Sequence, residues 1–436
     1  MIACVEKMPL PSDINPDVEF AAGDTTYLLV SPVWDSAYDF QTPVEISIAP
    51  DGRIFVADSA AHGIVVLEQA GNKSNGFDDL TDLKTDAGDN LSPIDVDIDK
   101  KMNVFYIDGS QQVYVWNQYF NTVGIDSIAT GGWFYQEDGD TVWVESGTAD
   151  WIEKANDPDW RLGDVVWGLD EVLRDSILAP HLFYDGAWPK SILADIYYES
   201  ELSKFTGLST TEDNADFIYV TDAHNNRIVR LDLERTYYLR MKSGVKIWTH
   251  AGIFGHTVTG YGTGAGTVNQ PFGIDVDYAG NIYYSQNGDF FAVHKIKPVY
   301  TGGYIAYPSV FQQGVNDIMD LFRFSSPNDV AVDLNQFVYV ANTCAREIQV
   351  FDSNGQFFKK AGVEEVTVDT TIWVVQGTDS VAIDTFYIRE EKGFLVSPRA
   401  VTVDNRGVVY ICDTGAGSVI RYRLSNQLDE DLTPVQ

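Results

Sequence analysis

The chain has 436 residues and a formal net charge of −35, with 64 acidic against 29 basic residues. A surface this acidic argues against nucleic-acid binding, because phosphate backbones are held by positively charged side chains. Hydrophobic residues make up 44% of the chain, yet no run of 18 apolar residues occurs, so the composition predicts a folded core and no transmembrane helix.

Residues 1–24 are predicted to be a tether that leads to the folded part of the chain. Cys4 follows Met1-Ile2-Ala3, which resembles the end of a bacterial lipobox, although no basic and apolar export signal precedes it. Cys4 is therefore either an incidental thiol or a lipidation site. A lipid there would anchor an exported protein of the bacterial cell surface or periplasm, such as an outer-membrane lipoprotein. The other two cysteines, Cys344 and Cys412, could pair, and the sequence does not decide this.

Six segments repeat one pattern: a proline, an alternation of apolar and small residues, an aspartate, a turn, and a second apolar run. Residues 327–333 and 337–342 give an example, Pro-Asn-Asp-Val-Ala-Val-Asp and Phe-Val-Tyr-Val-Ala-Asn. The alternation predicts two strands joined by a turn, and a third strand follows, as at 226–231 and 347–351. The repeats are predicted to begin at Pro43, Pro93, Pro189, Pro271, Pro327 and Pro398.

This pattern resembles the NHL repeat, whose blades read Pro-x-Gly-Ile-Ala-Val-Asp, then Gly-Asn-Ile-Tyr-Val-Ala-Asp, then Asn-x-Arg-Ile. Residues 222–228, Asp-Ala-His-Asn-Asn-Arg-Ile, match the last part best. The resemblance covers residues 25–425 and implies an all-β fold, a six-bladed β-propeller in a single domain, because such small sheets are buried only by stacking around an axis. We expect residues 26–30 to complete the last blade and close the ring, and residues 426–436 to be a polar tail.

Long insertions separate the blades, and the largest spans residues 118–188. It holds six of the ten tryptophans and many acidic residues, and we expect a short amphipathic helix near 168–178. Such aromatic surfaces suit protein or glycan partners, although the same tryptophans could build a satellite core over the blades. A second insertion should end in a helix at 315–322, and a third, 363–396, should add strands. The candidate binding surface consists of Trp133, Trp143, Trp151, Trp160 and Trp167.

The first candidate site is one mouth of the central channel, where the second residue after each repeat proline is expected to lie near the axis. Three carboxylates converging there would repel one another unless a cation or protons neutralised them, and oxygen ligands favour calcium or magnesium over zinc. Asn328-Asp329 also resembles a segment of gluconolactonase-type propellers, and that resemblance implies Glu45 and Asn328 as ligands of a divalent ion. The alternative is a polar channel filled with water. Around the ring the position reads Glu45, Asp95, Ser191, Gly273, Asp329 and Ala400. The proposed metal ligands are Glu45, Asp95, Asn328 and Asp329.

Aspartates also recur deeper in the repeat. Asp97 and Asp275 stand two residues further along the inner strand, where they either line the channel or hydrogen-bond to neighbouring inner strands. The aspartates that end the first apolar run should cap the following turn by accepting bonds from its backbone N–H groups. These are Asp99, Asp195, Asp277, Asp333 and Asp404.

The sequence favours one function and leaves two alternatives open. Neither a Gly-x-Ser-x-Gly nor a His-Glu-x-x-His motif is present. The favoured interpretation is a non-catalytic binding or scaffold propeller, exported and lipid-anchored through Cys4, that contacts a protein or glycan. The alternatives are a calcium-dependent hydrolase or lactonase with its metal at the channel mouth, and a structural subunit of a larger surface assembly.

Overall fold

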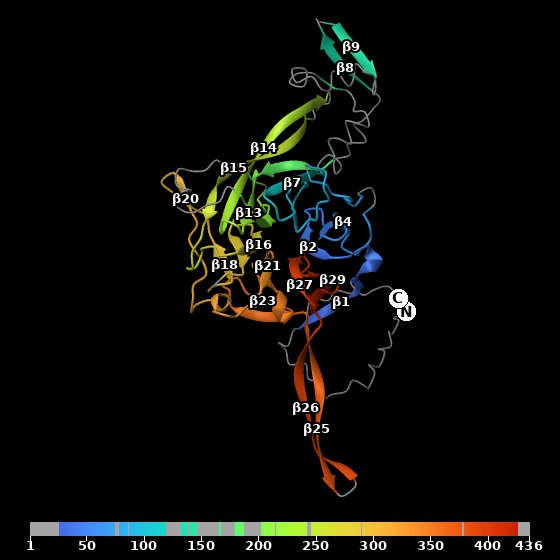
Figure 1. Cartoon of the computed structure of the whole chain (residues 1–436), viewed down its shortest axis with the longest axis vertical. Helices are drawn as coiled ribbons and strands as arrows, with labels where there is room; N and C mark the ends of the chain where they lie inside the picture. Colours follow the sequence, from blue (N-terminus) through green and yellow to red (C-terminus); the bar gives the residue numbers. More distant parts are fainter. Residues whose placement is uncertain are drawn as a thin grey trace, which may run out of the picture.

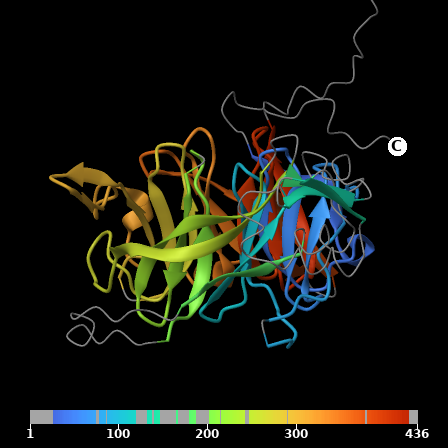
Figure 2. The same ribbon diagram turned by 90° about the horizontal axis from the view of Figure 1, so that it is seen from above.

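Six small antiparallel sheets stand around a common axis and form a disc (Figure 1). The computed structural model describes residues 26–74, 78–85, 87–118, 132–137, 140–145, 165–166, 179–186, 202–213, 215–241, 246–288, 290–376 and 379–425. Figure 2 shows the sheets, here called blades, side by side, with their strands running across the thickness of the disc. Helical structure within the described residues is limited to 3-10 turns such as Ser36–Tyr38 and Asp317–Met319.

The strands of the blades follow one another in chain order from the axis outward. Blade one consists of β2 (Pro43–Ile48), β3 (Ile54–Asp58) and β4 (Gly63–Leu67). Blade two consists of β5 (Asp95–Ile98), β6 (Asn103–Ile107), β7 (Gln112–Asn117) and β11 (His181–Asp185). Blade three consists of β12 (Phe205–Ser209), β13 (Phe217–Asp222), β14 (Arg227–Met241) and β15 (Lys246–Thr259), with the short β10 (Val165–Val166) beside β14.

The other three blades repeat this order. Blade four consists of β16 (Pro271–Val276), β17 (Ile282–Gln286) and β18 (Val293–Ile296). Blade five consists of β21 (Pro327–Val332), β22 (Val338–Asn342), β23 (Glu347–Phe351) and β24 (Phe357–Ala361). Blade six consists of β27 (Pro398–Val403), β28 (Val409–Asp413), β29 (Ser418–Leu424) and β1 (Tyr27–Trp34).

The first strand of the chain closes the ring. β1 pairs antiparallel with β29, from Tyr27 opposite Leu424 to Trp34 opposite Val419. Because β1 and β29 come from opposite ends of the repeat array, their pairing within blade six fastens the two ends of the ring together. The expectation that residues 26–30 complete the last blade is confirmed.

Blade three begins later than the repeat pattern predicted. The inner strand is β12, and Phe205 lies opposite Asp222 just as Pro43 lies opposite Asp58 in blade one. The predicted start at Pro189 is therefore wrong, and residues 187–201 lie outside the described residues. The pattern missed β12 because Phe205 takes the place of the proline and Thr211 takes the place of the turn aspartate.

Apolar side chains fill the spaces between neighbouring blades. Six buried clusters occur in the described residues, one at each junction between two blades. At the first junction, Phe55 of blade one packs in one cluster with Tyr106 and Trp116 of blade two. Because both faces of each sheet are covered this way, the blades are stable only as a ring.

The repeated aspartates cap turns, as expected. Asp99 Oδ1 accepts backbone N–H bonds from Lys101 and Asn103 at 2.8 and 2.9 Å, which fixes the turn after β5. Asp277, Asp333 and Asp404 accept the matching pairs of bonds in blades four, five and six. Asp195 lies outside the described residues, and in blade three Thr211 Oγ1 accepts the Ala215 N–H instead.

A second set of buried carboxylates ties blades one, three and six to the loops that lead into them. Asp58 accepts the N–H groups of Gln41 and Thr42, and Asp413 accepts those of Val396 and Ser397. In blade three Asp222 accepts the Lys204 N–H. These bonds set the position at which the inner strands of these blades start, and so they position the channel-lining side chains.

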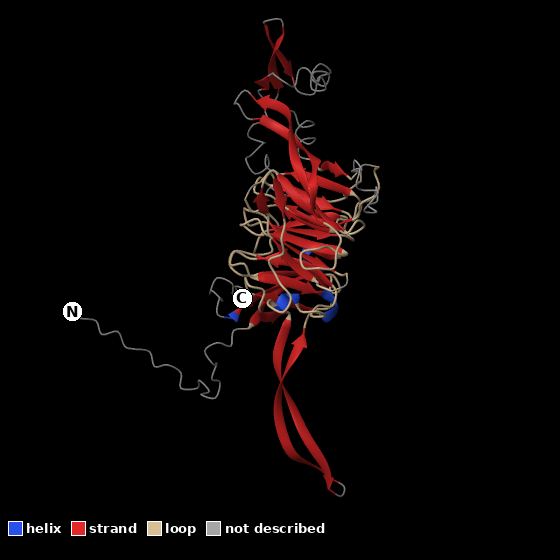
Figure 3. Ribbon diagram, turned by 90° about the vertical axis from the view of Figure 1, so that its left-hand side faces the viewer, coloured by secondary structure: helices blue, strands red, loops and turns tan. Residues whose placement is uncertain are grey.

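Two long hairpins extend the sheets beyond the disc. β14 and β15 continue past blade three, and β25 (Val363–Gln376) with β26 (Asp379–Gly393) leaves the ring between blades five and six (Figures 1 and 3). The extra strands expected over 363–396 are confirmed. The helix expected at 315–322 is reduced to the 3-10 turn Asp317–Met319, and the helix expected near 168–178 lies outside the described residues. No helix in the described part of the chain is long and apolar enough to cross a membrane.

Candidate functional site

The six inner strands surround a channel that has two different mouths. At the proline end, where the inner strands begin, the residue nearest the axis is acidic in three blades. In the other three blades it is glycine or alanine. Gly207 takes the place predicted for Ser191, because β12 is the inner strand of blade three. A Cβ on Gly273 would collide with the Asp329 carboxylate, so the glycine gives that side chain room to reach the next blade. The axial residues are Glu45, Asp95, Gly207, Gly273, Asp329 and Ala400.

Within the described residues, aspartates of the channel accept backbone N–H groups of the next blade at three of the six junctions. Asp95 Oδ2 accepts the Leu208 N–H of blade three at 2.8 Å, and Asp329 Oδ2 accepts the Val401 N–H of blade six at 2.8 Å. Adjacent inner strands do not pair with each other as a sheet, so their N–H groups need such side-chain acceptors.

One layer deeper, the same bonding recurs. Asp97 Oδ2 accepts the Thr210 N–H and Asp275 Oδ2 accepts the Val332 N–H, both at 2.7 Å. Both aspartates also line a small cavity of about 60 Å³ on the axis. The two roles considered for these residues, channel lining and bonding between inner strands, are therefore both present.

Burial makes these carboxyl groups hard to ionise. It is the main cause that raises the pKa of Glu45 well above its usual range, and the charges of Asp329 and Asp95 raise it further. Burial also raises the pKa of Asp329 to about 7, although its backbone hydrogen bonds and Arg399 act in the opposite direction. The axis therefore carries acids that share protons near neutral pH.

The predicted metal ligands are only partly brought together. Glu45, Asp95 and Asp329 line the same axial cavity, whereas Asn328 does not. Asn328 Oδ1 instead accepts bonds from Asn287 Nδ2 at 3.3 Å and from Ser326 Oγ at 3.4 Å. In the part of the chain that the structure describes, no group of three or more His, Cys, Asp or Glu side chains is arranged to hold a metal ion.

The tryptophan surface and the cysteines complete the predicted sites. The backbone register of β8 (Gly132–Glu137) and β9 (Asp140–Glu145) sets Trp133 opposite Val144 and Trp143 opposite Phe134. The other members, Trp151, Trp160 and Trp167, lie outside the described residues, as does Cys4.

Cys344 is exposed and Cys412 is buried, and the two are free thiols that do not pair.

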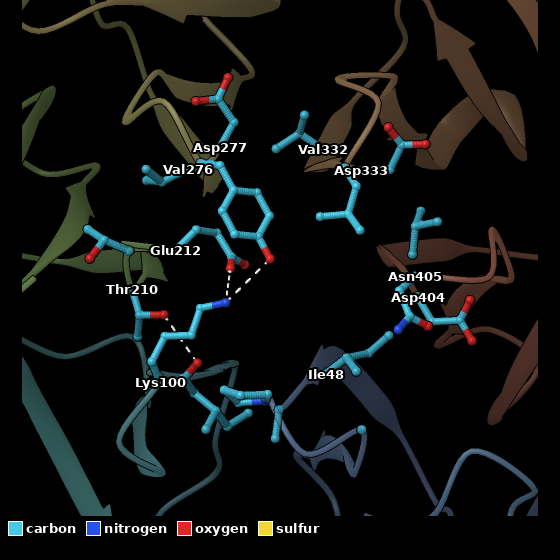
Figure 4. A pocket seen from close by; sticks show the side chains of 18 of the residues that line it. Ile48, Lys100, Thr210, Glu212, Val276, Asp277, Val332, Asp333, Asp404 and Asn405 are labelled. Atoms are coloured by element: carbon cyan, nitrogen blue, oxygen red, sulfur yellow. Dashed lines mark hydrogen bonds and ion pairs between the residues drawn. The ribbon is translucent and has the colours of Figure 1, made fainter. Parts of the chain in front are cut away.

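The opposite mouth, at the turn end of the inner strands, opens into a funnel of about 330 Å³ lined by all six blades. Lys100 of blade two extends across it and bonds Glu212 Oε2 of blade three at 2.7 Å (Figure 4). The same ammonium group lies 3.3 Å from Tyr278 Oη and 4.9 Å from the centre of that ring, which comes from blade four. Three consecutive blades thus present one connected cluster to the funnel.

The floor of the funnel is mostly apolar. Each inner strand contributes the residue just before its turn position, and the axial cavity with its carboxylates lies below them. Figure 4 shows Asp333 and Asp404 directed away from the centre, as their turn-capping bonds require. The floor residues are Ile48, Ile98, Thr210, Val276, Val332 and Val403.

Comparisons with known proteins find matches among solved structures alone. No family model and no curated protein matches the chain. The solved structures that it resembles include a streptogramin B lyase, at 11% identity and a TM-score of 0.41 over 92% of this chain and 98% of the other. A gluconolactonase from Xanthomonas campestris is 11% identical, with a TM-score of 0.45 over 92% and 90%. An auxiliary nutrient binding protein from Bacteroides ovatus is 10% identical, with a TM-score of 0.44 over 92% and 77%.

The decisive observation is the ring itself, with six radial sheets around one axis, closed by pairing of β1 with β29. The chain is a six-bladed β-propeller. The architecture that the NHL-like repeats predicted is thereby confirmed.

The funnel of the propeller was missed by the sequence analysis, although a signal for it exists. The rim residues directly follow the turn position of each repeat, as Lys100 follows Asp99 and Tyr278 follows Asp277. Reading that position around the ring would have found every rim residue except Glu212, which was hidden by the wrong start of blade three. The rim consists of Pro50, Lys100, Glu212, Tyr278, Leu334 and Asn405.

Proposed function

We propose that this propeller is a non-catalytic binding or scaffold protein that docks a protein partner on the hairpin β25–β26. The observation that supports this is the length and isolation of the hairpin. Its ladder runs from Val363 opposite Gly393 to Gln376 opposite Asp379, and within the described residues neither strand pairs with a third. Figure 3 shows it projecting from the disc.

A free ribbon of this kind is physically incomplete. A single two-stranded hairpin is marginally stable in water, and both of its edges present unpaired backbone N–H and C=O groups. A partner that adds a strand to one edge would satisfy those groups and order the ribbon. The base is already fixed, because the Phe394 N–H bonds the Gly362 carbonyl at 3.0 Å and Leu395 is buried against Gly362.

Shortening the hairpin should therefore remove partner binding without unfolding the ring. We expect a chain in which an Asn-Gly turn replaces residues 366–390 to keep the melting temperature of the ring, because in the described part of the chain the removed residues pair only with one another. A photo-crosslinker at position 371 of the full-length chain, in its source cells, should give a discrete heavier product. The same group at the exposed Phe322 serves as the control.

The products of this experiment separate the candidate functions. A product that contains a different protein supports the binding role, and one that contains a second copy supports a structural subunit of a larger assembly. The absence of any product specific to position 371, or collapse of the shortened chain, would contradict docking on this hairpin.

A second candidate function is a calcium-dependent hydrolase at the proline end of the channel. It is favoured by one observation: Glu45, Asp95 and Asp329 line one cavity, where burial raises the pKa of each, and the charge of Asp329 further raises the pKa of Glu45 and of Asp95. A divalent cation could neutralise the cluster in place of protons. For this candidate, calcium should raise the melting temperature of the wild type but not of Asp329→Ala, while the exposed Asp320→Ala should respond like the wild type. Equal responses of the wild type and Asp329→Ala would eliminate it.

The protein is further proposed to be exported and anchored by a lipid on Cys4. The support is the short Ala3-Cys4 motif followed by a polar stretch. Mass spectrometry of native protein should find Cys4 as the first residue with a diacylglyceryl group. Native material that begins with unmodified Met1 would contradict the anchor.

A further inference from the structure

We infer that the funnel at the turn end binds a small neutral saccharide. The funnel is separate from the hairpin and lies at the mouth opposite to the proline end, so the inference does not depend on the function proposed above. Its volume of about 330 Å³ is at the lower end of the usual range for small-molecule sites, roughly 300–1,000 Å³. All six blades line it, so it is held by rigid strand ends rather than by one flexible loop.

The charged groups of the funnel are already balanced. Lys100 is paired with Glu212 at 2.7 Å, and Asp51 lies 3.4 Å from Arg53 outside the rim. Asp404 is paired with Arg406 at 2.8 Å.

The two remaining carboxylates are engaged within their own blades. Asp277 accepts turn N–H groups and the side chains of Asn281 and Tyr283, and Asp333 accepts turn N–H groups and the Tyr339 hydroxyl. An anionic ligand would be repelled by these carboxylates, and a cationic ligand would have to compete with Lys100 for Glu212, and therefore a neutral ligand fits best.

The remaining surface combines apolar and hydrogen-bonding groups. Tyr278 is 55% exposed and Leu334, from the next blade, is 56% exposed, so two apolar surfaces border the funnel above its apolar floor. The amides of Gln69 and Asn405, which both donate and accept hydrogen bonds, also line the funnel.

A sugar ring matches this combination. Its C–H face packs on an aromatic ring, while its hydroxyl groups donate and accept at the same time and so suit amide and carboxylate neighbours. In this arrangement Tyr278 is the stacking platform. Lys100 and Glu212, held against each other, offer one donor group and one acceptor group to adjacent hydroxyls.

Calorimetric titration of the full-length protein tests the inference. The neutral probes are D-glucose, D-galactose, D-mannose and N-acetyl-D-glucosamine, and the charged probes are D-glucuronate and D-glucosamine. We expect saturable binding of at least one neutral sugar in the millimolar range. Tyr278→Ala should weaken it about tenfold or more, a loss of about 1.4 kcal/mol, because the stacking surface is removed.

Two further variants make the test specific. Tyr261→Ala removes an even more exposed tyrosine, 70% exposed, that does not line the funnel, and it should bind like the wild type. Lys100→Met leaves Glu212 without its ammonium partner and should shift the preference toward the cationic D-glucosamine. The inference is overturned if no neutral sugar binds saturably, if only the charged probes bind, or if Tyr278→Ala and Tyr261→Ala bind alike.

Discussion

Replacement of Asp222 by alanine is expected to lower the free energy of unfolding by about 3–5 kcal/mol, the usual cost of breaking a buried ion pair. Asp222 is fully buried and Arg227 is only 2% exposed, and Arg227 Nε donates to Asp222 Oδ2 at 2.9 Å. The same carboxylate also accepts the Lys204 N–H at 3.0 Å and Asn225 Nδ2 at 2.8 Å. The substitution thus leaves a buried guanidinium facing a cavity and frees the loop that leads into blade three.

Asp216→Ala in the same blade is the matched control. Asp216 also pairs with a basic residue, Lys101, at 2.5 Å, but it is 60% exposed. Exposed pairs contribute about 0–1 kcal/mol, because water and salt screen them. Urea unfolding followed by tryptophan fluorescence would measure both variants, and similar losses for the two would show that burial is not what gives Asp222 its importance.

The second large effect concerns pH. The protein should lose stability as the pH rises from about 4 to about 7, because the raised pKa of Asp329, about 7, keeps a proton on the folded chain that the unfolded chain has released. Folded protein then binds more protons than unfolded protein, so the free energy of unfolding falls through this interval and levels off above it. The groups that face Asp329 act in both directions: Asp97 raises its pKa, as does burial, while Arg399 lowers it.

Asp329→Asn should flatten this dependence. The amide oxygen can still accept the Val401 N–H, and the amide cannot ionise, so the variant avoids burying a charge at high pH. We expect nearly equal stability at pH 4 and an advantage for the variant of a few kcal/mol at pH 8, since a shift of about three pKa units corresponds to about 4 kcal/mol.

Urea unfolding at the two pH values measures this difference. Asp320→Asn, an exposed acid outside the channel, is the control and should follow the wild type. Parallel stability curves for the wild type and Asp329→Asn would contradict the expectation.

The repeat pattern predicted the fold because each feature of the pattern has a local physical cause. Alternation of apolar residues with small or polar ones predicts strands, and aspartates such as Asp99 and Asp404 cap the turns between these strands. A blade that keeps these residues can therefore be found from its sequence. Blade three lacks the proline and the turn aspartate, and its inner strand could not be found by the same signals. The structure was needed there because pairing with β13, not local sequence, selects Phe205–Ser209.

Each candidate site is found by comparing one position of the repeat in all six blades. Comparing the second residue after each proline brought Glu45, Asp95 and Asp329 to one cavity, but it gave no indication that the aspartates bond the next blade. The funnel depends on Lys100, Glu212 and Tyr278 from three blades. Their proximity follows from the closure of the ring, which no local pattern encodes.

Ring closure also determines the order in which the blades can fold during translation. The two ends of the closing seam are far apart in the chain, since Thr26 N bonds Ser425 Oγ across 399 positions. Among the strands of the ring, β1 is synthesised first and its partner β29 last. Blades one to five can therefore assemble during translation, whereas β1 must wait with an open edge until β29 emerges from the ribosome. Translation arrest or a nonsense mutation just before β29 would thus release an open, aggregation-prone arc instead of a slightly shortened propeller.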